Sequence, residues 1–390
     1  MRIALDALPL VSSRMTGIGY CEAGQVQAMM MLHPEEQYVL QFFDKGDGAE
    51  KRKRLYYYEQ QRNVSVRQGH FSGYLYRLMT TAIPLPYRAF FGKDADITHF
   101  FNYIIPPGVA GKRIVTVHDM VYKTFPETVR GRTRFMLESG LQRSLHRADL
   151  IVTDSEFSKT EIIRYFPATE ERIRVVPCGV DKLRFSPMPP AAAPAIEELK
   201  RRMHLQANYF LYLGTLEPRK NLDRLIRAYA LLKQQHPDAP QLVLAGGYGW
   251  RNNHIYQLVQ TLHLEDDVLD VQPEEKVQPE EDVQPLLCGA MAFVFPSVYE
   301  GFGMPPLEAM ACGTPVLTTR AASLPEVVGD AAVIVDPHHT EDIAQGLEKL
   351  FLDAALRERL QKEGLRRAAM FSWENAAAAL YDVYQEALTR

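Results

Sequence analysis

The stretch Pro296-Ser-Val-Tyr-Glu-Gly-Phe-Gly-Met-Pro-Pro-Leu-Glu-Ala-Met-Ala-Cys-Gly-Thr-Pro315 carries the clearest structural pattern in the chain. An apolar run that predicts a buried strand ends near Pro296, and a turn with two glycines follows it. The next residues predict a helix with Pro305 or Pro306 in its first turn and Gly313 at its end, which is the usual asymmetry of helix ends. A strand, a glycine-rich turn and a helix in this order are typical of an α/β domain with a parallel sheet.

Two carboxylates flank this turn. Glu300 is expected at the C-terminal end of the strand, where α/β sheets bind their ligands. Glu308 is expected in the first turn of the helix, where an acid also has a purely structural interpretation, because it stabilises the helix dipole by about 0.3–1 kcal/mol. Carboxylates bind sugar and ribose hydroxyls through charge-assisted hydrogen bonds, and free amides at a helix start bind phosphate.

The same alternation of apolar runs and helical patterns extends to both sides of this stretch. In the second half it predicts strands at 209–213, 241–245, 290–295, 315–318 and 332–335, and helices at 222–235, 305–312 and 340–355. In the first half it predicts strands at 2–8, 37–43, 97–101, 113–117 and 150–153, and helices at 20–32 and 133–148. A last helix is expected within 371–390, with Ser372 as its N-cap.

The length of 390 residues favours two domains. The proline-rich segment 187–206 is expected to be a linker because prolines make it poor for either helix or strand. We therefore expect domains at 1–186 and 207–370, followed by the helix at 371–390. The net charge of −4 argues against a dedicated nucleic-acid binder.

The four cysteines are far apart in the sequence and form no Cys-x-x-Cys pair. This pattern predicts reduced thiols rather than a disulfide framework or a zinc site. No apolar run reaches the roughly 18 residues of a membrane-spanning helix, and the N-terminus reads as a strand rather than a signal peptide. Together these features predict a cytoplasmic protein.

The block Glu300-x7-Glu308 resembles the family 4 retaining glycosyltransferases. Four further segments share the resemblance in the same order: Gly17 with Gly19, Val115-Thr-Val-His-Asp119, Tyr212-Leu-Gly-Thr-Leu-Glu-Pro-Arg-Lys-Asn221 and Phe371-Ser-Trp-Glu374. The resemblance implies the GT-B fold, in which two Rossmann-like, doubly wound domains face a central cleft. It also implies that the first domain binds the acceptor, that the second binds the nucleotide sugar, and that the C-terminal helix crosses back to the first domain.

The resemblance also implies a role for each matching residue. Glu300 would contact hydroxyls of the transferred sugar, Glu308 would hold the ribose, and His118 would contact the sugar at the reaction centre. Gly17, Gly19, Arg219 and Lys220 would lie on the donor diphosphate. The donor sugar and nucleotide would also contact Phe302, Gly303, Met304 and Leu307. Thr215 stands where some relatives carry an arginine, so part of the phosphate clamp is expected to rest on Arg219.

Two of these assignments also have a purely structural interpretation. His118 can be a structural histidine, and Arg219 and Lys220 can be a solvated pair of surface cations. Chemistry nevertheless requires positive charge near the leaving diphosphate, because breaking a sugar–phosphate bond leaves charge on the β-phosphate. No Asp-x-Asp motif stands in a suitable setting for a metal. We therefore expect Arg219 and Lys220 to stabilise the charge on the leaving diphosphate, with no resident metal or cofactor. The nucleotide sugar is the co-substrate, with GDP-mannose expected from family frequency.

The predicted activity is hexosyl transfer with retention, from a nucleotide sugar to a polysaccharide or lipid-linked oligosaccharide. One alternative is a nucleotide-sugar epimerase or a phosphorylase on the same fold, although phosphorolysis requires a second phosphate site or a cofactor lysine that the sequence does not reveal. Another is a non-catalytic sugar-nucleotide binding protein, against which intact His118, Lys220 and Glu300 argue.

Two charged blocks are left over. Residues 51–93 hold nine basic residues and one acid, interleaved with aromatics, and 265–282 hold nine acids and one base around the repeat Val-Gln-Pro-Glu-Glu. The acidic block is expected to be a loop. The basic block predicts either a solvated face with core aromatics or peripheral docking on the cytosolic face of an anionic membrane, where each Lys or Arg contributes about 1 kcal/mol.

Overall fold

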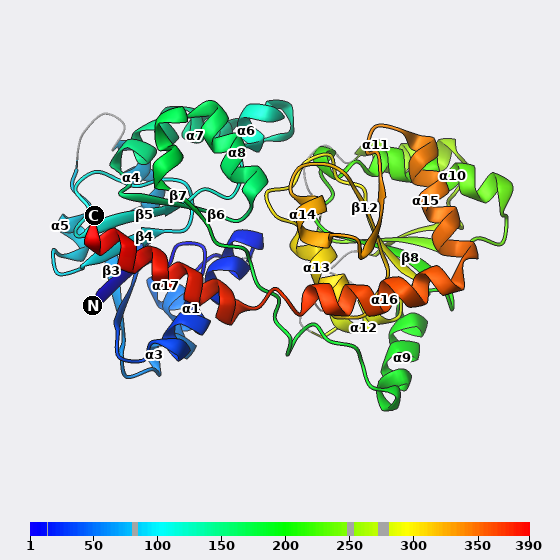
Figure 1. Cartoon of the computed structure of the whole chain (residues 1–390), viewed down its shortest axis with the longest axis horizontal. Coiled ribbons are helices and arrows are strands. Elements are labelled where there is room, and N and C mark those ends of the chain that lie inside the picture. The colour runs from blue at the N-terminus through cyan, green and yellow to red at the C-terminus, as the bar shows by residue number, and fades with distance from the viewer. Residues whose placement is uncertain (14, 80–84, 248–252, 272–280) are drawn as a thin grey trace. The chain divides into compact units, whose positions relative to one another are not determined.

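The computed structural model describes the chain except for residues 14, 80–84, 248–252 and 272–280. Contacts divide it into two compact units (Figure 1). The first unit comprises Met1–Gly179 and Ser372–Arg390, and the second comprises Val180–Phe371. The first unit therefore ends shortly before residue 186, where we expected the boundary, and the C-terminal helix belongs to it, as the resemblance implied.

The first unit is built on a parallel sheet with the strand order β3-β2-β1-β4-β5-β6-β7. Its strands are β1 (Arg2–Asp6), β2 (Gln37–Asp44), β3 (Val64–His70), β4 (Ile97–Phe100), β5 (Lys112–Thr116), β6 (Leu150–Thr153) and β7 (Ile173–Val175). The helices include α1 (Gly17–Leu32), α2 (Gly48–Arg54), α3 (Tyr56–Glu59), α4 (Gly73–Met79), α5 (Arg88–Phe91), α6 (Val121–Thr124), α7 (Gly131–Arg147), α8 (Glu156–Tyr165) and α17 (Trp373–Thr389). The central strands are buried on both faces, which explains why they read as continuous apolar runs.

Helix α17 packs along α1 on one face of this sheet (Figure 1, red and blue). Ser372 caps it, because its hydroxyl accepts a hydrogen bond from the amide of Asn375 at 3.1 Å, which confirms the predicted N-cap. A Cβ on Gly24 would lie 2.2 Å from the Trp373 ring, so glycine is required where the two helices meet. The hydroxyl of Tyr384 lies 2.8 Å from Nδ1 of His99 and ties α17 to the sheet.

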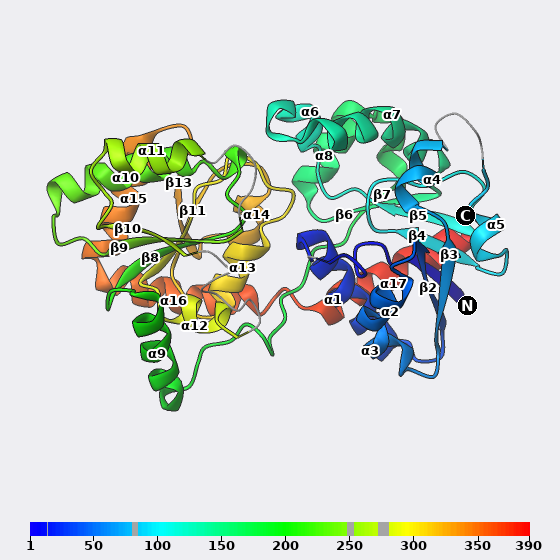
Figure 2. The same cartoon turned by 180° about the vertical axis from the view of Figure 1, so that it is seen from behind.

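The second unit is built on a parallel sheet with the order β10-β9-β8-β11-β12-β13. Its strands are β8 (Tyr209–Leu213), β9 (Gln241–Ala245), β10 (Val268–Val271), β11 (Ala292–Phe295), β12 (Val316–Thr319) and β13 (Ala332–Val335). Helices α10 (Leu222–Gln235), α11 (Asn253–Thr261) and α15 (Thr340–Leu352) cover one face (Figure 2). Helices α12 (Val283–Cys288), α13 (Met304–Ala311) and α16 (Ala354–Ala368) cover the other, while α9 (Ala193–Met203) packs on α12 and α14 (Leu324–Val328) follows β12.

Three predictions of local structure outside the predicted site residues were wrong. The expected linker contains helix α9, because Pro194 lies in its first turn, where a missing amide proton breaks no hydrogen bond. The helix expected at 340–355 ends at Leu352, and α16 starts anew after Asp353, whose carboxylate accepts a hydrogen bond from the amide of Leu356 at 2.8 Å. The acidic block is not all loop, since it contains β10, and its Val-Gln-Pro-Glu-Glu repeats fall largely outside the described residues.

Both sheets reverse their strand order at one point. The reversal lies between β1 and β4 in the first unit and between β8 and β11 in the second. At a reversal, the loops after the two neighbouring strands run in opposite directions. This opens a crevice at the carboxyl ends of these two strands, where α/β proteins bind ligands. Each unit therefore has its own preferred ligand-binding edge.

Candidate active site

In the second unit, three of the predicted residues meet at the strand reversal. Arg219 and Lys220 follow β8, and Glu300 lies in the turn after β11. The Nζ atom of Lys220 lies 2.6 Å from Oε1 of Glu300, and Nη1 of Arg219 lies 2.7 Å from Oε2. Lys220 and Glu300 are each only 7% exposed. These contacts join Arg219, Lys220 and Glu300 into one ion cluster. The sequence placed these residues on two separate loops and did not show that they touch.

Burial and charge compete within this ion cluster. Burial raises the pKa of Glu300, but the positive charges of Arg219 and Lys220 outweigh it, and the pKa falls to about 2. The pKa of Lys220 is lowered by burial and by Arg219, and Glu300 offsets only part of that effect. Arg219 also pairs with Glu217 at 2.6 Å, so two cations face two carboxylates. Glu300 is thus an anion at neutral pH and can accept, but not donate, hydrogen bonds.

Two side chains that sequence reasoning missed hold these loops together. Asn221, at φ 61°, donates from Nδ2 to the carbonyls of Pro296 and Pro337, at 3.0 and 2.8 Å. The hydroxyl of Ser323 lies 2.6 Å from the carbonyl of Phe302 and 2.9 Å from that of Glu300, and both accept from its single proton. Asn221 directly follows the recognised Arg-Lys pair, whereas only the fold brings Ser323 to the turn.

Helix α13 begins at Met304, with Gly303 as its N-cap at φ 125°. A Cβ on Gly303 would meet the Leu324 side chain at 3.0 Å, so the turn requires glycine. The helix starts earlier than expected because both prolines fit in its first turn, whose amides lack intrahelical partners. Glu308 therefore lies in the second turn rather than the first, which corrects our expectation.

Glu308 is partly buried, and the burial raises its pKa to about 7 against the opposing effect of Arg184, with Asp181 adding to the rise. Its carboxyl group therefore changes charge near neutral pH. The neighbouring Leu307 is 1% exposed, and its amide donates to the carbonyl of Gly303. The structure thus gives the Leu307 side chain a place in the core, while Phe302 and Gly303 lie in the turn and Met304 is the first residue of the helix.

His118 lies in the first unit, just after β5, and is 7% exposed. Its Nδ1 atom is 2.6 Å from Oδ2 of Asp154, and its Nε2 atom is 2.8 Å from the carbonyl of Phe101. Burial lowers the pKa of His118, but the attraction and hydrogen bond of Asp154 outweigh it and raise the pKa to about 10. Neither ring nitrogen is free to act as a base, and the sugar contact of His118 stays a prediction.

The glycines Gly17 and Gly19 lie in the first turn of α1 rather than in a preceding loop, because α1 begins at Gly17. A Cβ on Gly17 would meet nothing within 4 Å, whereas one on Gly19 would lie 3.2 Å from the carbonyl of Pro9. Packing therefore requires a small residue only at Gly19. Their assignment to the donor diphosphate stays a prediction.

A pocket of about 490 Å³ opens at the strand reversal of the first unit. The loop after β1 and the start of α1 contribute Ser12, Ser13 and Thr16, and Asn102 follows β4. Helix α2 and the residue before it contribute two ion pairs, Lys51 with Asp47 at 3.0 Å and Arg54 with Glu50 at 2.9 Å. The lining offers many hydrogen-bond donors and acceptors with balanced charge, which suits a polyhydroxylated ligand.

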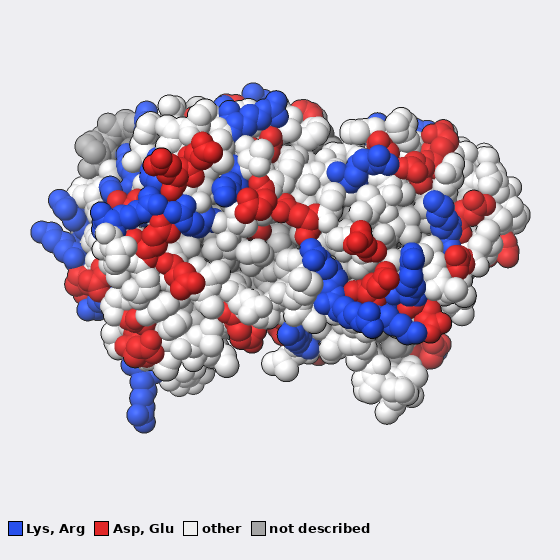
Figure 3. Space-filling view, in the orientation of Figure 1, with Lys and Arg blue, Asp and Glu red and all other residues white. Residues whose placement is uncertain are grey.

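Four of the nine basic residues in the block at 51–93 form ion pairs among the described residues, namely Lys51, Arg52, Arg54 and Arg67. Acids just outside its bounds pair with it, including Asp94 with Arg67 at 2.6 Å, and Arg52 pairs with Glu59 at 2.7 Å. Several of its aromatic side chains are buried in the core: Tyr58, Tyr76, Tyr87 and Phe91. Figure 3 likewise shows basic and acidic side chains interspersed on the face of this unit that carries α17. The observed packing favours the core-and-solvated-face interpretation for most of the block.

An exposed group remains on α2 and α3, namely Arg52, Lys53, Tyr56 and Tyr57. Among the described residues, no helix combines the length and the hydrophobicity that crossing a bilayer requires.

Both halves of the chain match known families. Residues 39–184 match the family described as Glycosyltransferase Family 4, and residues 197–367 match the one described as Glycosyl transferases group 1. The O-antigen chain mannosyltransferase B of Escherichia coli is 37% identical over 74% of this chain and 74% of its own length. The serotype-specific mannosyltransferase WbdA of the same species is 33% identical over 69% of this chain, which spans only 33% of that longer protein.

Solved structures share the whole fold at low sequence identity. Sucrose-phosphate synthase from Thermosynechococcus elongatus superposes with a TM-score of 0.73 and 20% identity, over 99% of this chain and 98% of that one. HepE from Anabaena, solved with UDP and glucose, superposes with a TM-score of 0.72 and 18% identity, over 99% and 100% of the two chains. The fold is therefore that of the two-domain GT-B glycosyltransferases.

Proposed function

The chain belongs to the group 1 and family 4 glycosyltransferases, and from that premise we propose that it transfers mannose from a nucleotide diphosphate sugar to a growing polysaccharide. Glycosyl transfer to a polysaccharide rests on the relatives that cover most of the chain, two of which are named as O-antigen or serotype-specific mannosyltransferases. Mannose, GDP as the nucleotide and retention at the anomeric carbon are our proposals.

The ion cluster of Glu300, Arg219 and Lys220 is the observation that supports this chemistry best. In the proposed reaction the bond between the anomeric carbon and the β-phosphate oxygen breaks, and its electron pair leaves with the diphosphate. Arg219 and Lys220 stabilise that charge, and in this role they replace a divalent metal. Glu300, held as an anion by these cations, accepts hydrogen bonds from sugar hydroxyls.

The acceptor hydroxyl then bonds to the anomeric carbon, and its proton passes to the departing phosphate oxygen. Retention requires attack from the face that the diphosphate leaves, because Glu300 is engaged by two cations and is not free to form a covalent intermediate. We place the acceptor in the pocket of the first unit, whose lining is neutral overall and rich in polar groups.

For a lipid-linked acceptor we propose that the exposed group of Arg52, Lys53, Tyr56 and Tyr57 contacts the cytosolic face of an anionic membrane. Its two tyrosines are 64% and 57% exposed, an amphipathic arrangement that suits the membrane interface. This surface is much smaller than the basic block from which the idea came.

A thermal-shift screen against GDP-, UDP- and ADP-sugars tests the donor proposal. Binding to the folded state raises the melting temperature by mass action, so GDP-mannose should give the largest shift. Lys220→Ala should abolish that shift, while Lys362→Ala, which changes an exposed lysine on α16, should keep it. A larger shift with another sugar nucleotide would overturn the donor assignment.

A product assay with and without acceptor then separates transfer from the alternatives. Polymer growth that depends on acceptor supports transfer, a changed donor sugar without acceptor indicates an epimerase, and binding without turnover indicates a non-catalytic protein.

A further inference from the structure

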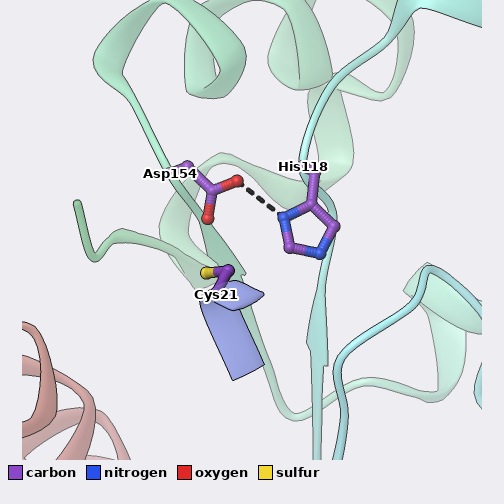
Figure 4. Close-up of side chains that lie close together, drawn as sticks. All are labelled: Cys21, His118 and Asp154. Carbon is purple, nitrogen blue, oxygen red and sulfur yellow. Dashed lines mark hydrogen bonds and ion pairs between the residues drawn. The ribbon is translucent and has the colours of Figure 1, made fainter. Parts of the chain in front are cut away.

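Four buried side chains gather in the first unit at the carboxyl ends of three neighbouring strands. His118 follows β5, Asp154 follows β6 and Cys178 follows β7, while Cys21 comes from the second turn of α1. They are 7%, 4%, 2% and 2% exposed, respectively. Figure 4 shows Cys21, His118 and Asp154 close together. The donor set of two thiols, an imidazole and a carboxylate is the set that zinc binds.

The spacing of these groups is compact. The ligand atoms of Cys21, His118 and Asp154 all lie within 4.8 Å of one another, and the sulfur of Cys178 is 3.2 Å from that of Cys21. A tetrahedral zinc ion, bound at about 2.0–2.3 Å, holds its ligand atoms about 3.3–3.8 Å apart. Small side-chain rotations would bring the atoms of Cys21, His118 and Asp154 onto one ion. Cys178 is not part of that group, so it becomes the fourth ligand only if its side chain turns from Cys21 toward the other two residues.

Two features orient the ligands as metal sites do. His118 directs Nε2 at the carbonyl of Phe101, 2.8 Å away, and a metal-bound histidine typically donates its second nitrogen to such a group. The Oδ1 atom of Asp154 is buried and has no hydrogen-bond partner among the described residues. In Figure 4 this second oxygen lies on the side of Cys21. A buried, unpartnered carboxylate oxygen is costly unless a further ligand satisfies it.

The hydrogen bonds of His118 also argue against Cys21 or Cys178 acting as a catalytic nucleophile. In a thiol–imidazole–carboxylate triad the histidine uses one nitrogen for the carboxylate and the other for the thiol. Here the second nitrogen of His118 faces the Phe101 carbonyl instead.

We propose that Cys21, Cys178, His118 and Asp154 form a structural zinc site in the first unit. Binding replaces the hydrogen bond between His118 and Asp154, and it releases about three protons, from the two thiols and from Nδ1 of His118. The zinc is then bound by two thiolates, one carboxylate and one neutral imidazole. Four protein ligands leave no open position, so the ion ties α1 to three strand ends and takes no part in catalysis.

This inference differs from the sequence expectation of four unliganded thiols. It is independent of the metal-free chemistry proposed for the diphosphate, because its ligands belong to the first unit and the ion cluster belongs to the second. It replaces the sugar contact that the resemblance implied for His118, because a zinc-bound His118 whose second nitrogen faces the Phe101 carbonyl has no ring nitrogen left for the sugar.

The test measures zinc bound to the full-length protein. The protein is treated with a phosphine reductant, incubated with excess zinc chloride and then washed free of unbound metal. Elemental mass spectrometry then gives the amount of zinc per chain. The wild type should retain about one zinc per chain, and Cys21→Ser and Cys178→Ser should each retain at least about tenfold less after the same washing. The matched control replaces Cys288 and Cys312, the two other thiols, and should retain the wild-type amount.

Wild-type protein that retains no zinc, or a Cys21→Ser variant that retains as much as the wild type, would overturn the proposal. A Cys21–Cys178 disulfide in protein purified without reductant, with no zinc uptake after reduction, would overturn it as well and would assign the pair to redox chemistry. If the serine variants fail to fold, the wild type is loaded with cobalt. Thiolate-to-cobalt absorption is then expected, and its absence contradicts the site.

Discussion

The two strand reversals have the same topology but opposite character. At the β8–β11 reversal the loops bring buried charges into direct contact, with Lys220 2.6 Å from Glu300. At the β1–β4 reversal the loops leave a pocket of about 490 Å³, in which each charged group on the α2 side already has an oppositely charged partner. The comparison teaches that the same strand order supports two kinds of site, and that the loop residues decide whether the reversal holds interacting buried charges or an open pocket.

The largest expected effect comes from the charged reversal. Lys220→Ala and Glu300→Gln should each lower kcat/KM by about 10²–10³-fold, the usual loss when one group that stabilises transition-state charge is removed. Steady-state transfer assays check this. Lys362→Ala should stay at the wild-type rate, and melting temperatures should show whether either site variant has merely unfolded. A near-normal rate in either variant would contradict the site.

A smaller and different effect is expected at the neutral reversal. Ser13→Trp should fill part of the pocket and raise the acceptor KM about tenfold, which corresponds to about 1.4 kcal/mol, while the donor KM stays unchanged. Ser65→Trp, on an exposed position of β3, is the matched control. If the donor KM rises instead, the pocket does not bind the acceptor.

The titration of Glu308 predicts a pH effect on the donor alone. Because the pKa of Glu308 is about 7, its carboxylate forms as the pH rises from 6 to 8. If this carboxylate holds the ribose, as the resemblance implies, the donor KM should fall over that range. Glu308→Gln should show a flat profile. Kinetics at fixed, saturating acceptor measure this, and an unchanged pH dependence in the variant would exclude Glu308 as the titrating group.

Glu308 also predicts the pH dependence of stability. Folding raises its pKa from 4.5 to about 7, so unfolding releases its proton between these values. The stabilisation is therefore complete below pH 4.5 and is lost as the pH rises through about 7. Melting curves should show Glu308→Gln gaining on the wild type between pH 5 and pH 8, and a constant difference would contradict the shift.

The smallest effect is expected outside both reversals. Replacing Lys53 by Glu and both Tyr56 and Tyr57 by Ser should lower co-sedimentation with vesicles of anionic lipid a few-fold, since each basic residue contributes about 1 kcal/mol. Transfer to a water-soluble acceptor should be unaffected. Equal sedimentation of variant and wild type would contradict the proposed membrane contact.

Much of the fold could be predicted because its signals are local. The strands 209–213, 241–245 and 332–335 and the helix 222–235 lie where their apolar patterns placed them. Strands 209–213 and 241–245 are recognisable because a strand buried on both faces is almost entirely apolar. Strand β3 was missed because Val64–His70, at the sheet edge, has only two apolar side chains, Val64 and Val66, and so lacks an apolar run. Helix α9 was missed because prolines at its start resemble a linker.

The sequence by itself determined the two-domain α/β class and the charged site of the second unit. Glu300, Gly303 and Glu308 lie within one turn and one short helix, and Arg219 and Lys220 are adjacent, so their chemistry is visible in short segments. Only the tertiary structure decided which hydrogen-bond and ion-pair partners these site residues have, and which residues surround His118. Asp154, Ser323 and Cys178 come from other strands and loops, and parallel strands that are neighbours in a sheet can be far apart in the sequence, so no local pattern could have paired them.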